Sequence, residues 1–462
     1  MTEWKVKKWP NGIAKNDRIK CQKTTEWNVK KWPDDIDNIY LNVNIPRIID
    51  TKVEKYLKLF GAIVIGGPKY CGKTWVGRQH SKSEILLRKG NDSTNIIELA
   101  QISPMTVLEG EKPRLIDEWQ FATNLWNEIR YDVDKEGLKG QYILTGSSTP
   151  NRRGILHSGA GRFCKLHLRP MSLYESGDST GDISLEAICN GKKISKMTGE
   201  VDIKKLAYLA IRGGWPANIN LSSSNSKDVL TEYLNLINDD DLDRIDNVKR
   251  DKRKVRLLLK SLARNESTTV SYNKLKDDIS GNDNVIIDTE TISSYLNALD
   301  RLFLLDNDEP FSVNVRSSIR VKKSEKRHFA DPSLACTLLN LSEDKLIYDL
   351  NTFGFIFESL VERDLKIYAD SFGAKNYHYQ DYDNKEIDHV IELEDGSWCA
   401  FEIKLGTNKI EEAANNLIEI KESIKKTGGN APKILCVICG LTNAAYIRPD
   451  GVYVVSITAL KN

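Results

Sequence analysis

The sequence predicts an α/β protein of several domains, with a parallel sheet first, helices in the middle and a mixed α/β unit at the end. Three observations support this prediction. The 462 residues exceed what one ordinary hydrophobic core holds. Apolar runs alternate with helix-length stretches between residues 61 and 145, which is typical of parallel strands covered on both faces. The last third changes to strand-like runs around one amphipathic helix.

Composition and charge restrict the classes of protein to consider. The chain is 40% hydrophobic and 29% charged, as expected for a folded soluble protein. Its net charge is +2, so any contact with DNA or RNA must come from local basic patches. Eight cysteines without a regular framework favour reduced thiols, and no apolar run suits a signal peptide or a membrane span. We therefore expect a cytoplasmic protein without a membrane partner.

The chain opens with a basic, tryptophan-containing repeat in residues 1–40. Residues 2–10 return at 25–33 with one change, from Lys5 to Asn28. Lysines interleaved with tryptophans could stack on single-stranded bases. We favour the alternative, a recent duplication in a loosely ordered arm, because two copies cannot build a solenoid.

A phosphate loop follows the first buried run of the next domain, residues 41–175. The run 62–65 is wholly apolar, and residues 67–74 fit the pattern G-x-x-x-x-G-K-T. The two glycines let successive amides point at phosphates, and a helix beginning near Thr74 adds its positive end. Lys73 is expected to reach the β- and γ-phosphates, and the Thr74 hydroxyl to ligate Mg²⁺. The predicted ATP-binding residues of this loop are Gly67, Pro68, Lys69, Tyr70, Cys71, Gly72, Lys73 and Thr74.

Two further apolar runs end in residues that suit ATP hydrolysis. The run at 115–116 leads into Asp117, expected to hold Mg²⁺, and Glu118, expected to orient or deprotonate the attacking water. The run at 142–144 leads into Thr145 and Ser147, whose hydroxyls could sense the γ-phosphate. Because the three runs come in the right order, we predict a Mg²⁺-dependent ATPase.

An arginine should also contact the γ-phosphate. Arg162, within the sequence Gly-Ala-Gly-Arg-Phe, is the first candidate, from the same chain or from a neighbouring subunit. Arg152 and Arg153 compete for this role. The alternative is that Arg162 is a surface arginine in a loop. The oligomeric state stays open.

The middle of the chain is expected to be helical. Residues 176–201 are rich in Gly, Ser and Asp and indicate a loop or boundary, so a helical connector is assigned to 176–253. Residues 254–330 read as three helices and a short strand, with 288–305 as the recognition helix of a winged helix. Basic runs at 249–256 and 316–327 flank this unit and could neutralise the phosphates of DNA or RNA. The alternative is a winged helix used only for packing.

Carboxylates and a lysine gather in the last domain, residues 331–462. Asp388 lies on one predicted strand, and Glu402 and Lys404 lie on the next, after a hairpin at Asp395 and Gly396. This order reproduces the PD-(D/E)xK nuclease signature, in which the acids bind Mg²⁺ and the lysine activates a water. Glu358, on the preceding helix, is the expected fourth member of the site. The alternative is a set of ordinary ion pairs on a solvated hairpin.

Several stretches together resemble a large prokaryotic group of predicted AAA+ superfamily ATPases. They are residues 45–50, the loop 67–74, 116–120, 144–148, 161–162, 169–175, 213–216 and 328–335. The resemblance covers about residues 40 to 460. It implies a P-loop ATPase of the AAA type followed by a domain of unknown function with a restriction-endonuclease-like fold. The repeat in 1–40 has no counterpart in this group.

Two functions therefore remain after the sequence is read. The first is an ATPase whose nucleotide state controls a nucleic-acid-binding or nuclease-like C-terminal domain, with ATP, Mg²⁺ and DNA or RNA as its ligands. The second is a nucleotide-switched regulatory or interaction protein whose nuclease fold is catalytically inert. A metabolic kinase finds little support, because no second small-substrate motif is present.

Overall fold

The computed structural model describes residues 45–87, 93–149, 158–283, 285–313, 324–381 and 383–462. These residues form one compact unit that begins at Ile45. The N-terminal repeat, Arg152 and Arg153 lie outside the described residues, as does most of the basic run 316–327. None of the described helices is both long and apolar enough to cross a membrane.

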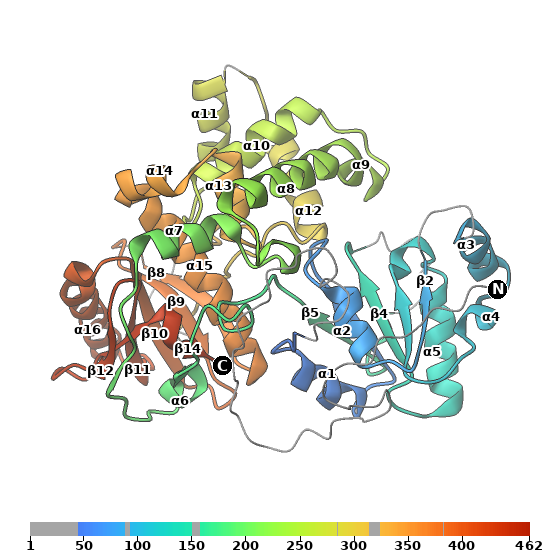
Figure 1. Cartoon of the computed structure of the whole chain (residues 1–462), viewed down its shortest axis with the longest axis horizontal. Helices are drawn as coiled ribbons and strands as arrows, with labels where there is room; N and C mark the ends of the chain where they lie inside the picture. The colour runs from blue at the N-terminus through green and yellow to red at the C-terminus, as the bar shows by residue number, and fades with distance from the viewer. Residues whose placement is uncertain (1–44, 88–92, 150–157, 284, 314–323, 382) are drawn as a thin grey trace, which may run out of the picture. The chain divides into compact units, whose positions relative to one another are not determined.

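The first sheet is parallel throughout, as predicted (Figure 1). Its spatial order is β2-β3-β4-β1-β5. The strand that leads into the phosphate loop is β1, and β4 lies between it and β3. The strand bounds are β1 Ala62–Gly66, β2 Ser83–Leu86, β3 Arg114–Asp117, β4 Tyr142–Gly146 and β5 Phe163–His167.

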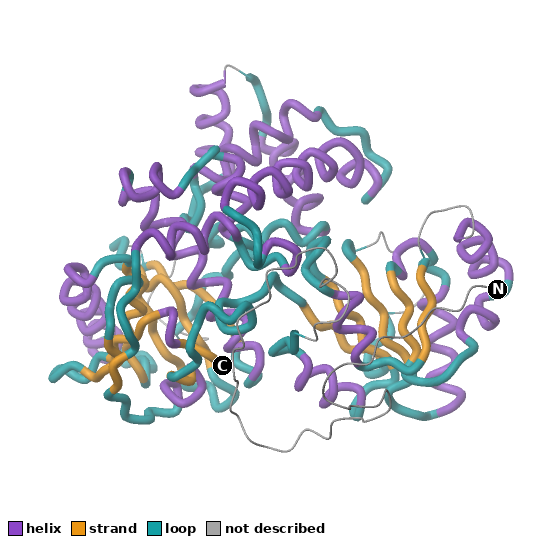
Figure 2. The backbone as a smooth tube through the Cα atoms, viewed as in Figure 1, coloured by secondary structure: helices purple, strands orange, loops and turns teal. Residues whose placement is uncertain are grey.

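Both faces of this sheet are buried, which explains the unbroken apolar runs. Ala62 and Val64 pack with residues of α4 and α5, whereas Ile63 and Ile65 pack with residues of α1 and α2. Figure 2 shows the strands of this sheet with helices on either side. The helices of this region are α1 Asp50–Leu57, α2 Lys73–Gln79, α3 Ser93–Ile102, α4 Pro104–Leu108 and α5 Leu125–Glu136, with a 3₁₀ turn η2 at Trp119–Phe121.

The middle region is helical, as predicted. Its helices are α7 Ile203–Arg212, α8 Ser223–Leu236, α9 Leu242–Arg244, α10 Lys252–Arg264, α11 Tyr272–Asp283, α12 Thr289–Arg301, α13 Pro332–Leu338 and α14 Glu343–Tyr348. A 3₁₀ turn η3 (Pro216–Asn218) follows α7, and a π-helical turn η4 (Ile237–Asp241) joins α8 to α9. After α12 the chain forms antiparallel bridges, Leu305 with Phe329 and Asp308 with Lys326. Three helices followed by such a pairing suit a winged helix, which stays a prediction.

The C-terminal sheet has seven strands in the order β7-β12-β13-β11-β10-β9-β8. Helix α15 (Leu350–Ser371) packs with one face and α16 (Ile410–Lys426) with the other. The predicted strands and helices are present, and β12 is an additional strand. The bounds are β7 Lys196–Met197, β8 Lys375–Gln380, β9 Glu386–Glu392, β10 Trp398–Lys404, β11 Ile434–Cys439, β12 Ala444–Ile447 and β13 Tyr453–Ser456, with 3₁₀ turns η5 (Thr407–Lys409) and η6 (Ile457–Ala459).

Two predicted domain boundaries differ from the packing, at the start of the helical connector 176–253 and at the start of the last domain 331–462. Its first part, 176–201, holds β6 (Ile183–Ser184), α6 (Leu185–Cys189) and β7. Strand β6 pairs with β14 (Leu460–Lys461) and β7 pairs with β12, so this segment belongs to the C-terminal unit. Two-residue strands are too short for a periodic pattern, which is why the sequence indicated a loop. Helix α13, assigned to the last domain, packs on α7, α8 and α10 of the middle region as well as on α15.

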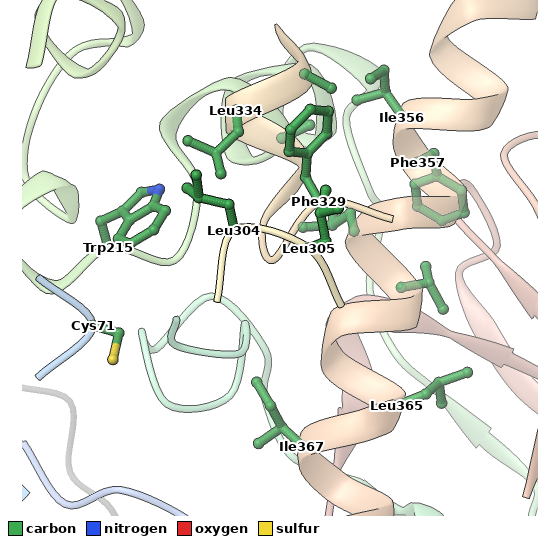
Figure 3. Close-up of a cluster of buried hydrophobic side chains, with 14 of the residues drawn as sticks. Cys71, Trp215, Leu304, Leu305, Phe329, Leu334, Ile356, Phe357, Leu365 and Ile367 are labelled. Atoms are coloured by element: carbon green, nitrogen blue, oxygen red, sulfur yellow. The ribbon is translucent and has the colours of Figure 1, made fainter. Parts of the chain in front are cut away.

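One apolar cluster runs through the first sheet, the middle helices and α15. Its members include Cys71, Trp215, Leu305, Phe329 and Phe357, which Figure 3 labels. Leu305 and Phe329 come from the bridged segments after α12, and Phe357 comes from α15. The phosphate loop and the last sheet are therefore joined by continuous packing.

Candidate nucleotide site and buried charge cluster

The predicted phosphate loop has the backbone that such a loop needs. It leaves β1 at Gly66 and enters α2 at Lys73. A Cβ atom at Gly67 would lie 2.2 Å from the carbonyl oxygen of Leu168, and Gly72 adopts a φ of 101°. Other residues fit neither position without moving the backbone. The two glycines therefore fix the course of the loop.

The ammonium group of Lys73 folds back onto the backbone of the loop. The side chain is buried, and Nζ donates to the carbonyl oxygens of Gly67 at 3.0 Å and Pro68 at 2.7 Å. Its position at the start of α2 puts this charge beside the free backbone amides of the helix. The loop thus concentrates positive potential in one place, as an anionic phosphate group requires.

Three oxygen groups converge next to the loop. The Oδ1 atom of Asp117 accepts from Thr74 Oγ1 at 2.7 Å and from Thr145 Oγ1 at 2.5 Å. The strand order explains this meeting, because Thr145 on β4 is in register with Ile65 on one side and Asp117 on the other. Carboxylate and hydroxyl oxygens are the ligands that Mg²⁺ prefers, so Thr74 and Asp117 fit the predicted role.

Glu118 is held beside this group by two polar side chains. Its φ of 58° and ψ of 44° are left-handed and turn the residue out of the line of β3. Ser147 Oγ donates to Glu118 Oε2 at 3.0 Å, and Gln120 Nε2 also donates to Oε2. Gln120 reaches Ser147 Oγ at 3.3 Å as well. The sequence predicted Glu118 and Ser147, whereas the positioning contact of Gln120 was not predicted.

Arg162 is not brought to the phosphate loop of its own chain. It precedes β5, and its carbonyl oxygen accepts from the amide of Ala62, the first residue of β1. The loop follows the last residue of β1, about 16 Å away at the usual rise of a strand. The guanidinium group instead binds Asp134 at 2.7 Å. The prediction that Arg162 contacts the γ-phosphate within one chain is therefore wrong, because parallel pairing puts the start of β5 at the opposite edge.

Two contacts fix the loop from outside and were not predicted. Buried Arg47 donates to the carbonyl oxygens of Cys71 and Arg169, each at 2.8 Å, and to Glu175 at 2.9 Å. Lys69 binds Asp241 of η4 through both carboxylate oxygens, at 2.7 and 2.8 Å. Both partners are distant in sequence, so no local pattern could have shown them.

The cysteine and the tyrosine of the loop have packing roles. Burial raises the pKa of the Cys71 thiol, and its Sγ lies 3.3 Å from the Leu168 carbonyl oxygen. A buried, protonated thiol is a poor nucleophile. The Tyr70 ring packs edge-on against Tyr233 of α8, with 6.3 Å between centroids.

The predicted carboxylates and lysine of the last domain also converge. Lys404 Nζ lies 2.9 Å from Asp388 Oδ2 and 2.6 Å from Glu402 Oε2. Asp388 Oδ2 also accepts from the backbone amide of Ile403 at 2.8 Å, and Asn416 of α16 donates to Glu402 at 2.9 Å. The antiparallel pairing of β9 with β10 brings these groups together. They are buried or half-buried, which excludes the alternative of a solvated hairpin face.

A second lysine lies among the carboxylates of this domain, and the sequence did not predict it there. Lys326 is 1% exposed. Its ammonium group pairs with Glu358 and lies 3.3 Å from Glu386 and 3.8 Å from Asp388. The sequence had placed Lys326 in a basic patch for nucleic acid, but a buried ammonium group cannot reach a phosphate. Its backbone pairing with Asp308 fixes it in this place.

The charges of this cluster shift one another's protonation. Burial would raise the pKa of Asp388, but the Lys404 and Lys326 ammonium groups bring it down to about 2. Burial raises the pKa of Glu358 to about 8 despite Lys326, and burial beside Asp388 raises the pKa of Glu402 to about 8. At neutral pH the cluster therefore holds two ammonium groups and only some ionised carboxylates. A divalent cation between Glu358, Glu386 and Asp388 does not fit while Lys326 is there.

Several side chains of the basic run 249–256 are also paired with acids. Arg250 is buried against Asp246 at 2.6 Å, and Lys252 binds Asp243 at 2.9 Å. In the described part of the run 316–327, Arg327 binds Glu325 at 2.8 Å. Such internal pairing weakens the prediction of a nucleic-acid surface, which stays untested.

Three family models match parts of the chain. Residues 60–177 match an AAA domain, 203–345 match a domain of unknown function (DUF8612), and 353–460 match another domain of unknown function (DUF4143). The first match agrees with the loop geometry, and together they support a P-loop, AAA-like ATPase domain in this part of the chain.

Sequence similarity to other proteins extends beyond the residues that match the AAA domain. Uncharacterised proteins of Mycobacterium bovis and Mycobacterium tuberculosis are each 24% identical over 349 residues, or 74% of this chain and 70% of the relative. A Walker-type ATPase of Pyrococcus abyssi is 13% identical, with a TM-score of 0.37, over 63% of this chain and 94% of its own. A RuvB variant of Thermotoga maritima is 17% identical, with a TM-score of 0.25, over 56% of this chain and 88% of its own.

Proposed function

We propose that the chain is a Mg²⁺-dependent ATPase whose nucleotide state controls its C-terminal unit, and that this unit acts as a binding module. The observation that supports the ATPase part best is the meeting of Lys73, Thr74, Asp117 and Thr145 at one edge of the parallel sheet. A triphosphate in the loop would have an ammonium group, helix amides and hydroxyl groups around it.

Each residue has a defined task in this proposal. Lys73 neutralises the β- and γ-phosphates, and Thr74 with Asp117 would hold Mg²⁺, which offsets charge on the phosphates. Glu118 orients the attacking water and accepts its proton. Ser147 and Gln120 keep the Glu118 carboxylate in place through the hydrogen bonds described above.

A line of contacts supports coupling between the loop and the last domain. Arg47 joins the loop to the Arg169 carbonyl oxygen at 2.8 Å, and Arg169 Nε binds Asp306 at 2.6 Å. Lys366 of α15 then reaches the Asp306 carbonyl oxygen at 2.5 Å and Asp308 Oδ1 at 2.9 Å. Asp308 pairs through its backbone with Lys326. A displacement of the loop therefore has a packed route to the carboxylate cluster.

The buried lysine favours a binding module over a nuclease. With the Lys326 ammonium group between Glu358, Glu386 and Asp388, the cluster is stabilised without a metal ion. The same acids are then unable to bring a divalent cation to a phosphodiester. This arrangement corresponds to the regulatory alternative, in which the nuclease fold is inert.

A nuclease remains a second candidate because Asp388, Glu402 and Lys404 converge as the signature requires. In that case the protein with Mg²⁺ or Mn²⁺ should nick DNA or RNA, and Asp388→Ala and Lys404→Ala should each abolish the activity. Cleavage that persists in both variants would exclude this site as its source.

The ATPase proposal is tested by phosphate release and nucleotide affinity. Lys73→Ala should lower ATP affinity and abolish hydrolysis, because the loop loses its only ammonium group aimed inward. Lys82→Ala is the matched control, since Lys82 is exposed before β2, at the other edge of the sheet, and should leave both quantities unchanged. Equal ATP affinity in Lys73→Ala and wild-type protein would overturn the proposal.

Coupling is tested separately by hydrogen exchange. Peptides spanning β9 and β10 should differ in protection between ATP-analogue and ADP states. Asp306→Asn, which weakens the link to Arg169 and lies outside the nucleotide site, should reduce that difference while hydrolysis continues. No difference between the nucleotide states in wild-type protein would refute the coupling.

A further inference from the structure

A second buried cluster lies beside Lys326 and takes no part in the proposed ATP hydrolysis, although Asp308 also belongs to the proposed coupling route. It consists of Asp308, His328 and Glu362, one residue from each bridged segment and one from α15. One imidazole nitrogen and two carboxylate oxygens of these residues lie within 4.8 Å of one another. All three residues are buried.

The facing atoms of the cluster have no hydrogen-bond partner. This holds for Asp308 Oδ2, Glu362 Oε1 and His328 Nε2, and the Nδ1 atom on the other side of the His328 ring has no partner either. Buried polar atoms without a partner are costly, by about 1–3 kcal/mol each, so several in one place indicate a missing ligand. His328 is 3% exposed, which excludes bulk water as that ligand.

The other atoms of the same side chains are already held by the protein. Asp308 Oδ1 binds Lys366 at 2.9 Å, and Glu362 Oε2 is bonded to His389 Nδ1. One oxygen of each carboxylate is therefore held by a neighbouring side chain, and the other oxygen is available to a ligand. Ligands fixed in this way are typical of metal sites, where outer partners aim the inner ones.

The histidine ring lies between two carboxylates but is hydrogen-bonded to neither. Its Nε2 lies 3.4 Å from Asp308 Oδ2, and its Nδ1 lies 3.5 Å from Glu266 Oε1 on the far side of the ring. Glu266 is itself fixed by Ser359 Oγ at 2.7 Å and the Phe329 amide. An imidazole between a carboxylate and a metal ion is a recurrent arrangement.

Distance and donor type select the ion. Two ligands at about 2.0–2.1 Å from a tetrahedral ion lie about 3.3–3.4 Å apart, which agrees with the 3.4 Å between His328 Nε2 and Asp308 Oδ2. An imidazole favours Zn²⁺ or another transition metal over Mg²⁺. We propose that Asp308, His328 and Glu362 form a binding site for one divalent transition-metal ion, with Zn²⁺ as the best match.

Such an ion would join three segments that are far apart in sequence. It would tie the bridged segments after α12 to α15, next to Lys366 and Lys326. This site is independent of ATP hydrolysis, so its loss and the loss of ATPase activity are separate outcomes.

Zinc titration of chelator-treated full-length protein, without nucleotide, tests the proposal. Wild-type protein should bind one Zn²⁺ per chain. His328→Ala should weaken binding at least 100-fold, and Glu266→Gln by roughly 10- to 100-fold. Two variants serve as controls and should keep the ion. His167→Ala removes a half-buried histidine whose Nε2 has no hydrogen-bond partner, and Asp388→Asn alters the neighbouring carboxylate cluster.

X-ray absorption at the zinc edge decides the case even if the variants do not fold. The wild-type protein should show only nitrogen and oxygen ligands near 2.0–2.1 Å. A sulfur shell near 2.3 Å would assign the zinc to cysteines and overturn the proposal. So would the absence of stoichiometric binding, or loss of the ion in Asp388→Asn rather than in His328→Ala.

Discussion

Replacing Lys326 by methionine tests whether this ammonium group stabilises the carboxylate cluster. Methionine keeps most of the length of the side chain and removes the charge. The change leaves Glu358, Glu386 and Asp388 without their shared partner. Loss of one member of a buried ion pair costs about 3–5 kcal/mol, because the remaining charge stays buried.

The cost should depend on pH in a direction fixed by Glu358. Burial raises the pKa of Glu358 in the folded state to about 8, above its ordinary value of 4.5. The favourable contribution of a raised pKa is complete below the unfolded value and is lost as the pH rises through the folded value. Below pH 7 Glu358 is protonated and uncharged, so it needs no cationic partner. Above pH 8 Glu358 is ionised, and its buried charge needs the Lys326 ammonium group. The destabilisation by Lys326→Met should therefore be larger at pH 8.5 than at pH 6.

Hydrogen exchange of peptides covering 386–404 measures the local free energy of opening. The matched control is Lys385→Met, because the Lys385 side chain pairs with exposed Glu419 at the surface and such a pair is worth less than about 1 kcal/mol. Addition of Mn²⁺ should restore protection in Lys326→Met and change the wild type less, since a cation can then take the position of the ammonium group. The reasoning fails if Lys326→Met costs no more than the control, or costs the same at both pH values.

Three other predictions concern single residues. Glu118→Gln should keep ATP affinity and slow hydrolysis by roughly 10²- to 10⁴-fold, as loss of a general base does; wild-type turnover would exclude Glu118 from that role. Arg162→Ala should leave phosphate release unchanged in isolated chains, because Arg162 binds Asp134 at the far edge of the sheet; a loss seen only at high protein concentration would instead reveal a contact between subunits. Glu402→Gln should flatten the pH dependence of protection in β10 between about pH 4.5 and 8, because the raised pKa of Glu402 makes its stabilising contribution decline over that window; an unaltered profile would contradict the raised pKa.

The sequence alone predicted the elements that depend on local pattern. The sequence predicted the apolar run at 62–65, the loop 67–74 and Asp117 at the end of β3. Glycine spacing and strand burial produce residue patterns that can be recognised directly in the sequence. The hairpin that carries Asp388, Glu402 and Lys404 was found for the same reason. Its two strands are adjacent in sequence, so their pairing follows from one turn.

Contacts between distant segments were beyond such reasoning. Arg47 is hydrogen-bonded to the loop, and Asp241 is hydrogen-bonded to Lys69. The residues of each pair lie far apart in the sequence, so no local pattern predicts the contact. Arg162 was misplaced because the sequence gives strand order along the chain, and only the sheet shows which ends meet.

The sequence by itself predicted a phosphate loop, a sheet of buried strands and a set of acids in the order of a nuclease signature. Only the tertiary structure decided what these acids do, because it brings Lys326 from another segment into their midst. It likewise brings Asp308, His328 and Glu362 together. The physical reason is that a charge acquires its chemistry from burial and from its neighbours, and both are set by the packing of segments that lie far apart in the chain.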